Sequence, residues 1–92
     1  MSNRFPTVGV VGAGQLARMM AAPATALGIR LVLFAQSNHD SGAQICEHVV
    51  GDYTDLAALK EFAKECDVIT FEHELIPLSV IKGLEADGVR VY

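Results

Sequence analysis

Short runs of apolar residues punctuate the chain, and glycine, proline or polar residues bound each of them. They lie at residues 7–11, 30–35, 48–50 and 67–71, and a further run begins at residue 89. The first run, between Pro6 and Gly12, is typical of a strand that is buried on both faces of a parallel sheet, and the other runs are also interpreted as strands. The pattern therefore predicts four strands and the beginning of a fifth.

Apolar residues recur at helical spacing in the segment after the first strand. The spacing predicts a helix over residues 15–27, and Gly28 is suited to end it. Pro23 lies inside this helix, where it removes one backbone hydrogen bond and clashes with the preceding turn. We therefore expect a kink, or a break and restart, near Ala22-Pro23.

Two further helices are predicted in the second half of the chain. Thr54 is a candidate N-cap for one of them, with Asp55 in its first turn. Pro77 suits the first turn of the other, which ends before Gly88. The apolar faces consist of Leu56, Leu59, Phe62, Ala63 and Cys66 in one helix and of Val80, Ile81 and Leu84 in the other.

The alternation of strands and helices predicts an α/β fold, a Rossmann-like parallel sheet flanked by helices on both faces. In such sheets ligands bind at the carboxyl ends of the strands, near the point where the strand order reverses. Four segments are expected to meet at this rim: residues 12–15, 35–37, 51–53 and 72–74. The last strand would form an unfinished sheet edge, so we expect this domain to be part of a longer enzyme.

Composition narrows the classes of partner. The chain has 92 residues, which is one domain at most, and a net charge of −4 without a Lys/Arg cluster, so a nucleic-acid partner is not expected. Its apolar runs are shorter than a membrane span, and its N-terminus does not resemble a signal peptide. Cys46 and Cys66 are far apart in sequence, which favours two reduced thiols in a cytoplasmic protein.

The glycine turn after the first strand has two interpretations. Residues 12–17 read GAGQLA, which matches the dinucleotide fingerprint with alanine at its third position. A dinucleotide-binding domain also needs an acidic residue at the end of the second strand, where this chain has Ala35-Gln36-Ser37. A nucleotide-binding dehydrogenase or nucleotide-sensing domain therefore stays an alternative, beside a turn that is merely tight.

Three segments together resemble carboxyaminoimidazole ribonucleotide synthetases of the ATP-grasp family. They are GAGQLARM at residues 12–19, GDYTD at residues 51–55 and DVITFEHELIP at residues 67–77. The resemblance extends over nearly the whole chain and implies the N-terminal, pre-ATP-grasp domain of an enzyme with about three domains. Ala17 stands where the family usually has glycine, and the end of the second strand lacks the family's common aspartate.

The resemblance implies an enzyme of purine biosynthesis. Such a ligase carboxylates aminoimidazole ribonucleotide with bicarbonate and ATP, and ATP and Mg²⁺ bind in the grasp domain outside this chain. The domain alone should be inactive, and we expect the full-length enzyme to be a homodimer. A similar formate-using enzyme that acts on glycinamide ribonucleotide is the closest alternative. That enzyme has glutamate at the position of Gln15, so the glutamine favours the imidazole substrate.

The resemblance also implies a substrate site at Gln15, Leu16 and Glu72. Glu72 follows the fourth strand, and a carboxylate at that rim can accept hydrogen bonds from an amine or a ribose hydroxyl. Glu74 points the same way if the strand extends that far. Gly14 completes the predicted substrate-binding set, because its lack of a side chain permits positive φ and close approach.

Overall fold

Four parallel strands form the sheet in the order β3-β2-β1-β4. The structure is a computed structural model, and it describes residues 6–72 and 77–91. The strands are β1 (Thr7–Val11), β2 (Arg30–Ala35), β3 (Glu47–Val50) and β4 (Val68–Phe71). The predicted parallel α/β sheet is confirmed, and all four strands lie within one residue of their predicted bounds.

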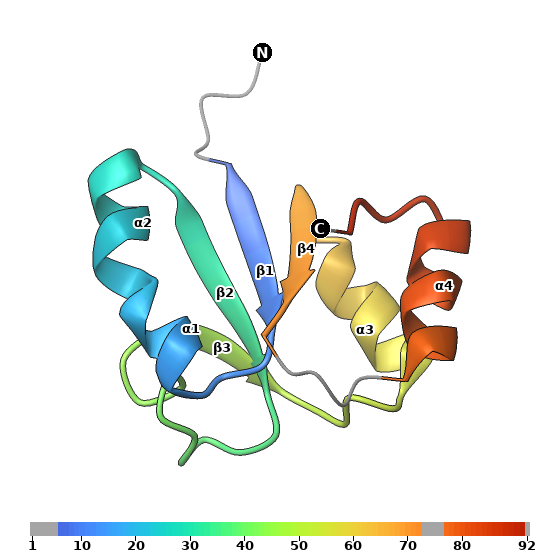
Figure 1. Cartoon of the computed structure of the whole chain (residues 1–92), viewed down its shortest axis with the longest axis horizontal. Helices are drawn as coiled ribbons and strands as arrows, with labels where there is room; N and C mark the ends of the chain where they lie inside the picture. Colours follow the sequence, from blue (N-terminus) through green and yellow to red (C-terminus); the bar gives the residue numbers. More distant parts are fainter. Residues whose placement is uncertain (1–5, 73–76, 92) are drawn as a thin grey trace.

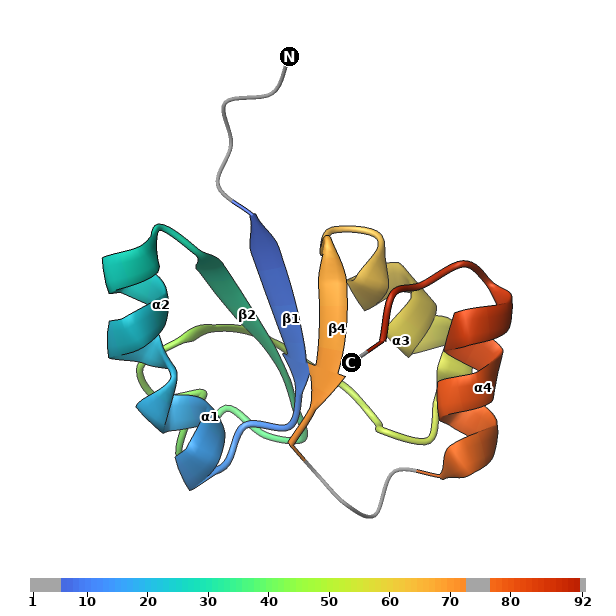
Figure 2. The same ribbon diagram turned by 45° about the horizontal axis from the view of Figure 1, so that its top comes forward.

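Helices cover both faces of the sheet. On one face lie α1 (Gln15–Met19) and α2 (Ala21–Leu27), and on the other lie α3 (Leu56–Ala63) and α4 (Leu78–Ala86) (Figures 1 and 2). Successive strand residues point to opposite faces, so Val10 packs with the α1 side and Val11 with the α3 side, and both are fully buried. This double burial explains why β1 is apolar without alternation.

The predicted break in the first long helix is confirmed, but it lies at Met20 and not at Pro23 itself. Proline cannot donate to the carbonyl four residues earlier, and its ring clashes with that carbonyl. For Pro23 that carbonyl belongs to Met19, the last residue of α1. The helix therefore restarts at Ala21, and Pro23 falls in the first turn of α2, where a missing N–H is tolerated.

The cap of α3 corrects the sequence prediction. The Asp55 side chain accepts a hydrogen bond from Ala58 N and is the N-cap. Thr54 is not the cap, because its hydroxyl and its backbone N–H both donate to the carboxylate of Asp52. Asp52 makes a local side-chain turn, and this moves the start of the helix one residue along the chain.

The fifth strand is reduced to one bridge in the described part of the chain. Val91 pairs with Ile69 in parallel, and Ile69 N donates to Arg90 O at 2.8 Å. Pro77 is the N-cap of α4 and not its first helical residue. Gly88 follows the end of that helix in the left-handed region, at φ 85°, as the sequence predicts.

Both cysteines are free and partly buried, as the sequence predicts. None of the helices within the described residues is long and apolar enough to cross a membrane.

Candidate functional site

The carboxyl ends of β1 and β4 lie side by side, and β4 is an edge strand of the four-stranded sheet (Figure 2). The chain continues from β1 to α1 on one face and from β4 toward α4 on the other, so this is the predicted point of strand-order reversal. Val11 pairs with Phe71 in the register, which brings Gly12 beside Glu72. Glu72 N donates to Val11 O at 3.0 Å, and this bond holds the start of the post-strand segment against the glycine turn.

The Glu72 carboxylate lies on the first turn of α1. Its Oε2 accepts hydrogen bonds from Gly14 N and Ala17 N, both at 3.2 Å. These two N–H groups have no partner within α1, because the first residues of a helix lack a preceding carbonyl. The carboxylate thus satisfies donors that would otherwise face solvent or a ligand. We call this arrangement of Gly14 N, Ala17 N and the Glu72 carboxylate the carboxylate cradle.

Close approach of Glu72 explains both glycines of the turn. A Cβ added at Gly14 would lie 2.6 Å from Glu72 Oε1, and one added at Gly12 would lie 2.9 Å from Glu72 Cβ. Only Gly12 has a positive φ, 128°. Gly14 has φ −84° and ψ −159°, an extended conformation that any residue adopts, so the expected positive φ at Gly14 is wrong. At position 14, the feature that a side chain would disturb is the close approach of the Glu72 carboxylate and not the backbone conformation.

The carboxylate cradle makes the glycine turn a poor fit for the pyrophosphate of a dinucleotide. In the dinucleotide fold, the N–H groups of this turn hold the pyrophosphate. Here they hold an internal carboxylate, which would repel a phosphate at the same place. Asp40, the first carboxylate after β2, accepts hydrogen bonds from Gln36 N and Ser37 N within its own loop. These residues do not fit the phosphate and ribose contacts of a bound NAD(P).

Gln15 lies on the opposite side of the turn and contacts the loop between β2 and β3. Ser41 Oγ donates to Gln15 Oε1 at 3.1 Å, and Arg18 Nη1 donates to Ser41 O at 3.2 Å. Gly42 N donates to Ala13 O at 2.6 Å. The structure thus ties this loop to the glycine turn, and Ser41 joins the rim as a residue that the sequence did not single out. Its polar loop carried no spacing that could have identified it.

The side chains of the other predicted rim residues within the described part of the chain do not join the carboxylate cradle. Leu16 lies next to the cradle, but its side chain is exposed and lines an apolar hollow between α1, α2 and the sheet. Tyr53 is buried in the core, and burial raises the pKa of its phenol, with the negative charges of Asp40 and Glu72 adding to the effect. Asp52 holds the turn before α3. Glu74 lies outside the described residues.

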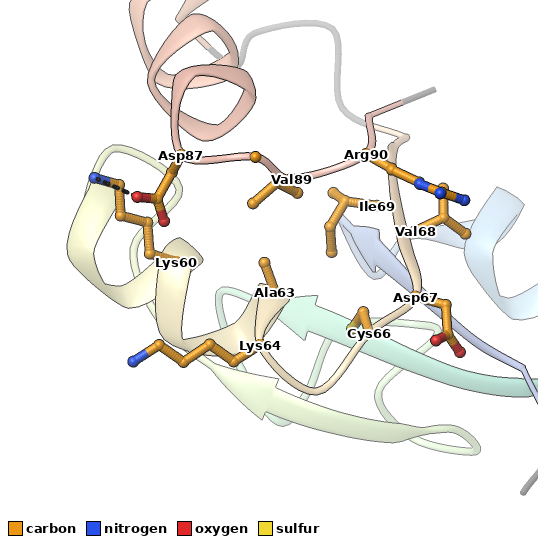
Figure 3. A pocket seen from close by; sticks show the side chains of 11 residues that line it. Lys60, Ala63, Lys64, Cys66, Asp67, Val68, Ile69, Asp87, Val89 and Arg90 are labelled. Carbon is orange, nitrogen blue, oxygen red and sulfur yellow. Dashed lines mark ion pairs between the residues drawn. The ribbon is translucent and has the colours of Figure 1, made fainter. Parts of the chain in front are cut away.

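A second pocket lies at the opposite end of the sheet and does not form a converging site. It has a volume of about 280 Å³ and lies between the end of α3, the start of β4 and the segment after α4. Figure 3 shows that Lys64 and Arg90 point to opposite sides, while Lys60 turns toward Asp87, with Nζ 4.0 Å from Oδ1. Cationic groups that diverge in this way do not bind one anion together.

Metal ligands do not gather in the described structure. Within residues 6–72 and 77–91, no three His, Cys, Asp or Glu side chains come together in a way that could hold a metal ion.

The fold and the rim together define a class of protein: an open parallel α/β domain whose candidate ligand site lies between the glycine turn after β1 and the acid after β4. The chain belongs to the family of ribonucleotide synthetase preATP-grasp domains, whose model matches residues 5–92. The resemblance found in the sequence is thereby confirmed.

Individual relatives agree with this family. The chain is 48% identical over 87 residues to the N5-carboxyaminoimidazole ribonucleotide synthase of Mycobacterium tuberculosis, covering 94% of this chain and 20% of that protein. The crystal structure of N5-carboxyaminoimidazole ribonucleotide synthetase from Thermotoga maritima matches 96% of this chain with a TM-score of 0.86 at 25% identity, over 25% of its own length. A third structure, from Aspergillus clavatus, is a complex of N5-carboxyaminoimidazole synthase with ADP and 5-aminoimidazole ribonucleotide. It matches 96% of this chain and 24% of its own, with a TM-score of 0.74 and 29% identity.

The chain thus spans about a fifth to a quarter of the length of these relatives.

Proposed function

We propose that this chain is the N-terminal domain of an ATP-dependent 5-(carboxyamino)imidazole ribonucleotide synthase and supplies part of its ribonucleotide site. The longer enzyme would carboxylate aminoimidazole ribonucleotide with bicarbonate and ATP, in purine biosynthesis. The observation that carries the proposal is the Glu72 carboxylate at the carboxyl end of β4, held beside the glycine turn. The membership of this chain in the ribonucleotide synthetase preATP-grasp domain family also supports a ribonucleotide as the substrate.

Each rim residue has a chemical role in this proposal. Glu72 accepts hydrogen bonds from the amine or the ribose hydroxyls of the ribonucleotide. Gln15, whose side-chain oxygen already accepts from Ser41, offers its amide N–H groups to the ligand. Gly14 and the backbone of Leu16, beside the carboxylate cradle, complete the proposed set, together with Glu74, which lies outside the described residues.

The remaining parts of the reaction belong to other domains in this proposal. ATP and Mg²⁺ would bind in an ATP-grasp domain outside this chain, as the resemblance to the ATP-grasp family implies. Bicarbonate would be activated there as well, and the 92-residue chain alone would be inactive. The complete enzyme would act as a homodimer in the cytoplasm.

Replacing Glu72 by glutamine in the complete enzyme tests the proposal. The glutamine oxygen can still accept from Gly14 N and Ala17 N, so the turn is preserved while the charge on the ligand side is lost. A charged hydrogen bond contributes about 1.5–3 kcal/mol, so KM for the ribonucleotide should rise roughly 10- to 150-fold. KM for ATP should stay unchanged.

Glu61→Gln is the matched control, since the Glu61 side chain on α3 is exposed and pairs with Lys64 away from the rim. It should leave both KM values unchanged. If the Glu72→Gln enzyme had the wild-type KM for the ribonucleotide, Glu72 would not bind the ribonucleotide.

A further inference from the structure

We infer that Gly14 is a positioning residue: it keeps the Glu72 carboxylate on the two N–H groups of the turn, so that the site takes a hydrogen-bond donor of its ligand and not a phosphate. This inference rests on the proposed function for the nature of the ligand, but the cradle itself can be tested without any ligand.

The two carboxylate oxygens of Glu72 have different surroundings. Oε2 accepts from both Gly14 N and Ala17 N, and Oε1 lies over position 14, where an added Cβ would be 2.6 Å away. With Oε2 held, Oε1 is the oxygen that remains to accept from a ligand. An ionised carboxylate only accepts hydrogen bonds, so its partner must be an amine or a hydroxyl.

The backbone of Gly14 has a conformation that does not require glycine. Its φ of −84° and ψ of −159° would suit alanine, so conformational freedom does not require glycine there. The nearest atoms to an added Cβ all belong to Glu72. The absence of a side chain at position 14 is therefore explained by the carboxylate that lies against it, 58 residues away in sequence.

Backbone hydrogen bonds hold both Glu72 and the glycine turn in place. Glu72 N donates to Val11 O at 3.0 Å, and Gly12 N donates to Phe34 O at 2.9 Å, so strand pairing fixes the backbone on each side of the cradle. Gly42 N donates to Ala13 O and ties down the middle of the turn. A carboxylate held between fixed elements keeps its geometry before the ligand arrives, which reduces the ordering cost of binding.

A double-mutant cycle in the 92-residue chain tests the cradle directly. Gly14→Ala should lower the folding equilibrium constant roughly tenfold in the wild-type background, and by less than about twofold in a Glu72→Ala background, where no carboxylate meets the new methyl group. Denaturant unfolding monitored by circular dichroism measures both. An equal loss in the two backgrounds would overturn the inference.

Amide hydrogen exchange supplies an independent measurement. In the Glu72→Ala variant, the amides of Gly14 and Ala17 should exchange at least about tenfold faster, because their shared acceptor is gone. The Glu61→Ala variant should leave both amides at the wild-type rate. Unchanged protection in Glu72→Ala would mean that the carboxylate does not hold these donors.

Kinetics of the complete enzyme separate this inference from the proposed function. Gly14→Ala should raise KM for the ribonucleotide, with less than about a twofold change in kcat and in KM for ATP, since a displaced carboxylate weakens binding at one site only. If the cycle and the exchange data support the cradle but ribonucleotide KM is unchanged, the cradle stands and its role in substrate binding fails. If the cycle shows no coupling, the cradle itself is wrong, whatever the substrate.

Discussion

Cys66 is a residue whose surroundings suppress its chemistry. Its Sγ donates to Phe62 O at 3.4 Å, beside the core. Burial raises the pKa of the thiol to about 11, and the negative charge of Glu65 acts in the same direction. Because the thiolate is the reactive form, the folded chain keeps this cysteine as an unreactive packing residue.

The two thiols should therefore differ in reactivity. Burial also raises the pKa of Cys46, but the positive charge of Arg18 opposes this effect. At pH 8 a thiol with a pKa of about 11 is roughly 0.1% ionised, and Cys46, whose pKa is raised less, keeps a larger ionised fraction. We expect iodoacetamide to alkylate Cys46 well before Cys66, and the Cys66 rate to keep rising with pH up to about 11. Mass spectrometry of the intact and digested chain measures both rates.

Denatured chain is the control for this measurement, because unfolding should bring the two rates together. Equal rates in the native chain at pH 8 would show that burial does not protect Cys66.

At Gly12 and Gly14, the turn was predictable from the sequence, but the group that lies against it was not. The glycine turn and its place after β1 were predictable from GAGQLA, since a strand precedes it and a helix follows. The occupant of the turn was not predictable, because Glu72 reaches it only through the register that pairs Val11 with Phe71. The fingerprint therefore indicated an anion from outside, whereas the anion belongs to the chain itself.

At the scale of elements, α3 begins through two adjacent polar residues with different tasks. Asp55 accepts from Ala58 N, while Thr54 donates to Asp52. Threonine and aspartate are both good N-caps by composition, so the sequence could not choose between them. The choice follows from the preceding turn, where Asp52 already engages the threonine hydroxyl.

Substitution of each residue should reveal this difference. Asp55→Ala should lower the free energy of unfolding by about 1 kcal/mol, the usual contribution of an N-cap. Thr54→Ala should cost less than about 0.5 kcal/mol, since it removes an exposed contact outside the helix. Urea unfolding curves at constant m-value measure both changes. A larger loss for Thr54→Ala than for Asp55→Ala would return the capping role to Thr54.

At the scale of the whole molecule, the fold was predictable because β1, β2 and β4 are largely apolar and bounded by turn residues, whereas the edge strand β3, with the sequence EHVV, is mostly exposed. The sequence placed the point of strand-order reversal beside the first strand, and the observed order β3-β2-β1-β4 agrees with that. The docking of the loop between β2 and β3 on the glycine turn, through Ser41 and Gly42, was not predictable. The contacts of Ser41 and Gly42 are single polar hydrogen bonds to the glycine turn and to α1, so they leave no periodic pattern in the sequence.

One face of the molecule exposes a group of large apolar side chains. Leu16, Met19 and Leu27 are all more than half exposed, and they surround a hollow of about 390 Å³ that is lined by apolar residues throughout. Leu78 at the start of α4 is also exposed, at 63%, but it does not line this hollow. Contiguous apolar surface differs physically from an isolated exposed leucine, because only the former offers several contacts to one apolar molecule.

A pair of leucine substitutions tests whether this hollow behaves as one apolar site. Leu27, at 74% exposure, contributes little to the core, so Leu27→Gln should change stability by less than about 0.5 kcal/mol. It should nevertheless reduce the fluorescence of a hydrophobic dye bound to the 92-residue chain, because it places an amide in the apolar wall. Leu78→Gln removes a similar exposed side chain and should leave the dye signal unchanged. Equal dye signals from both variants would mean that the exposed leucines act singly and that the hollow binds no apolar probe.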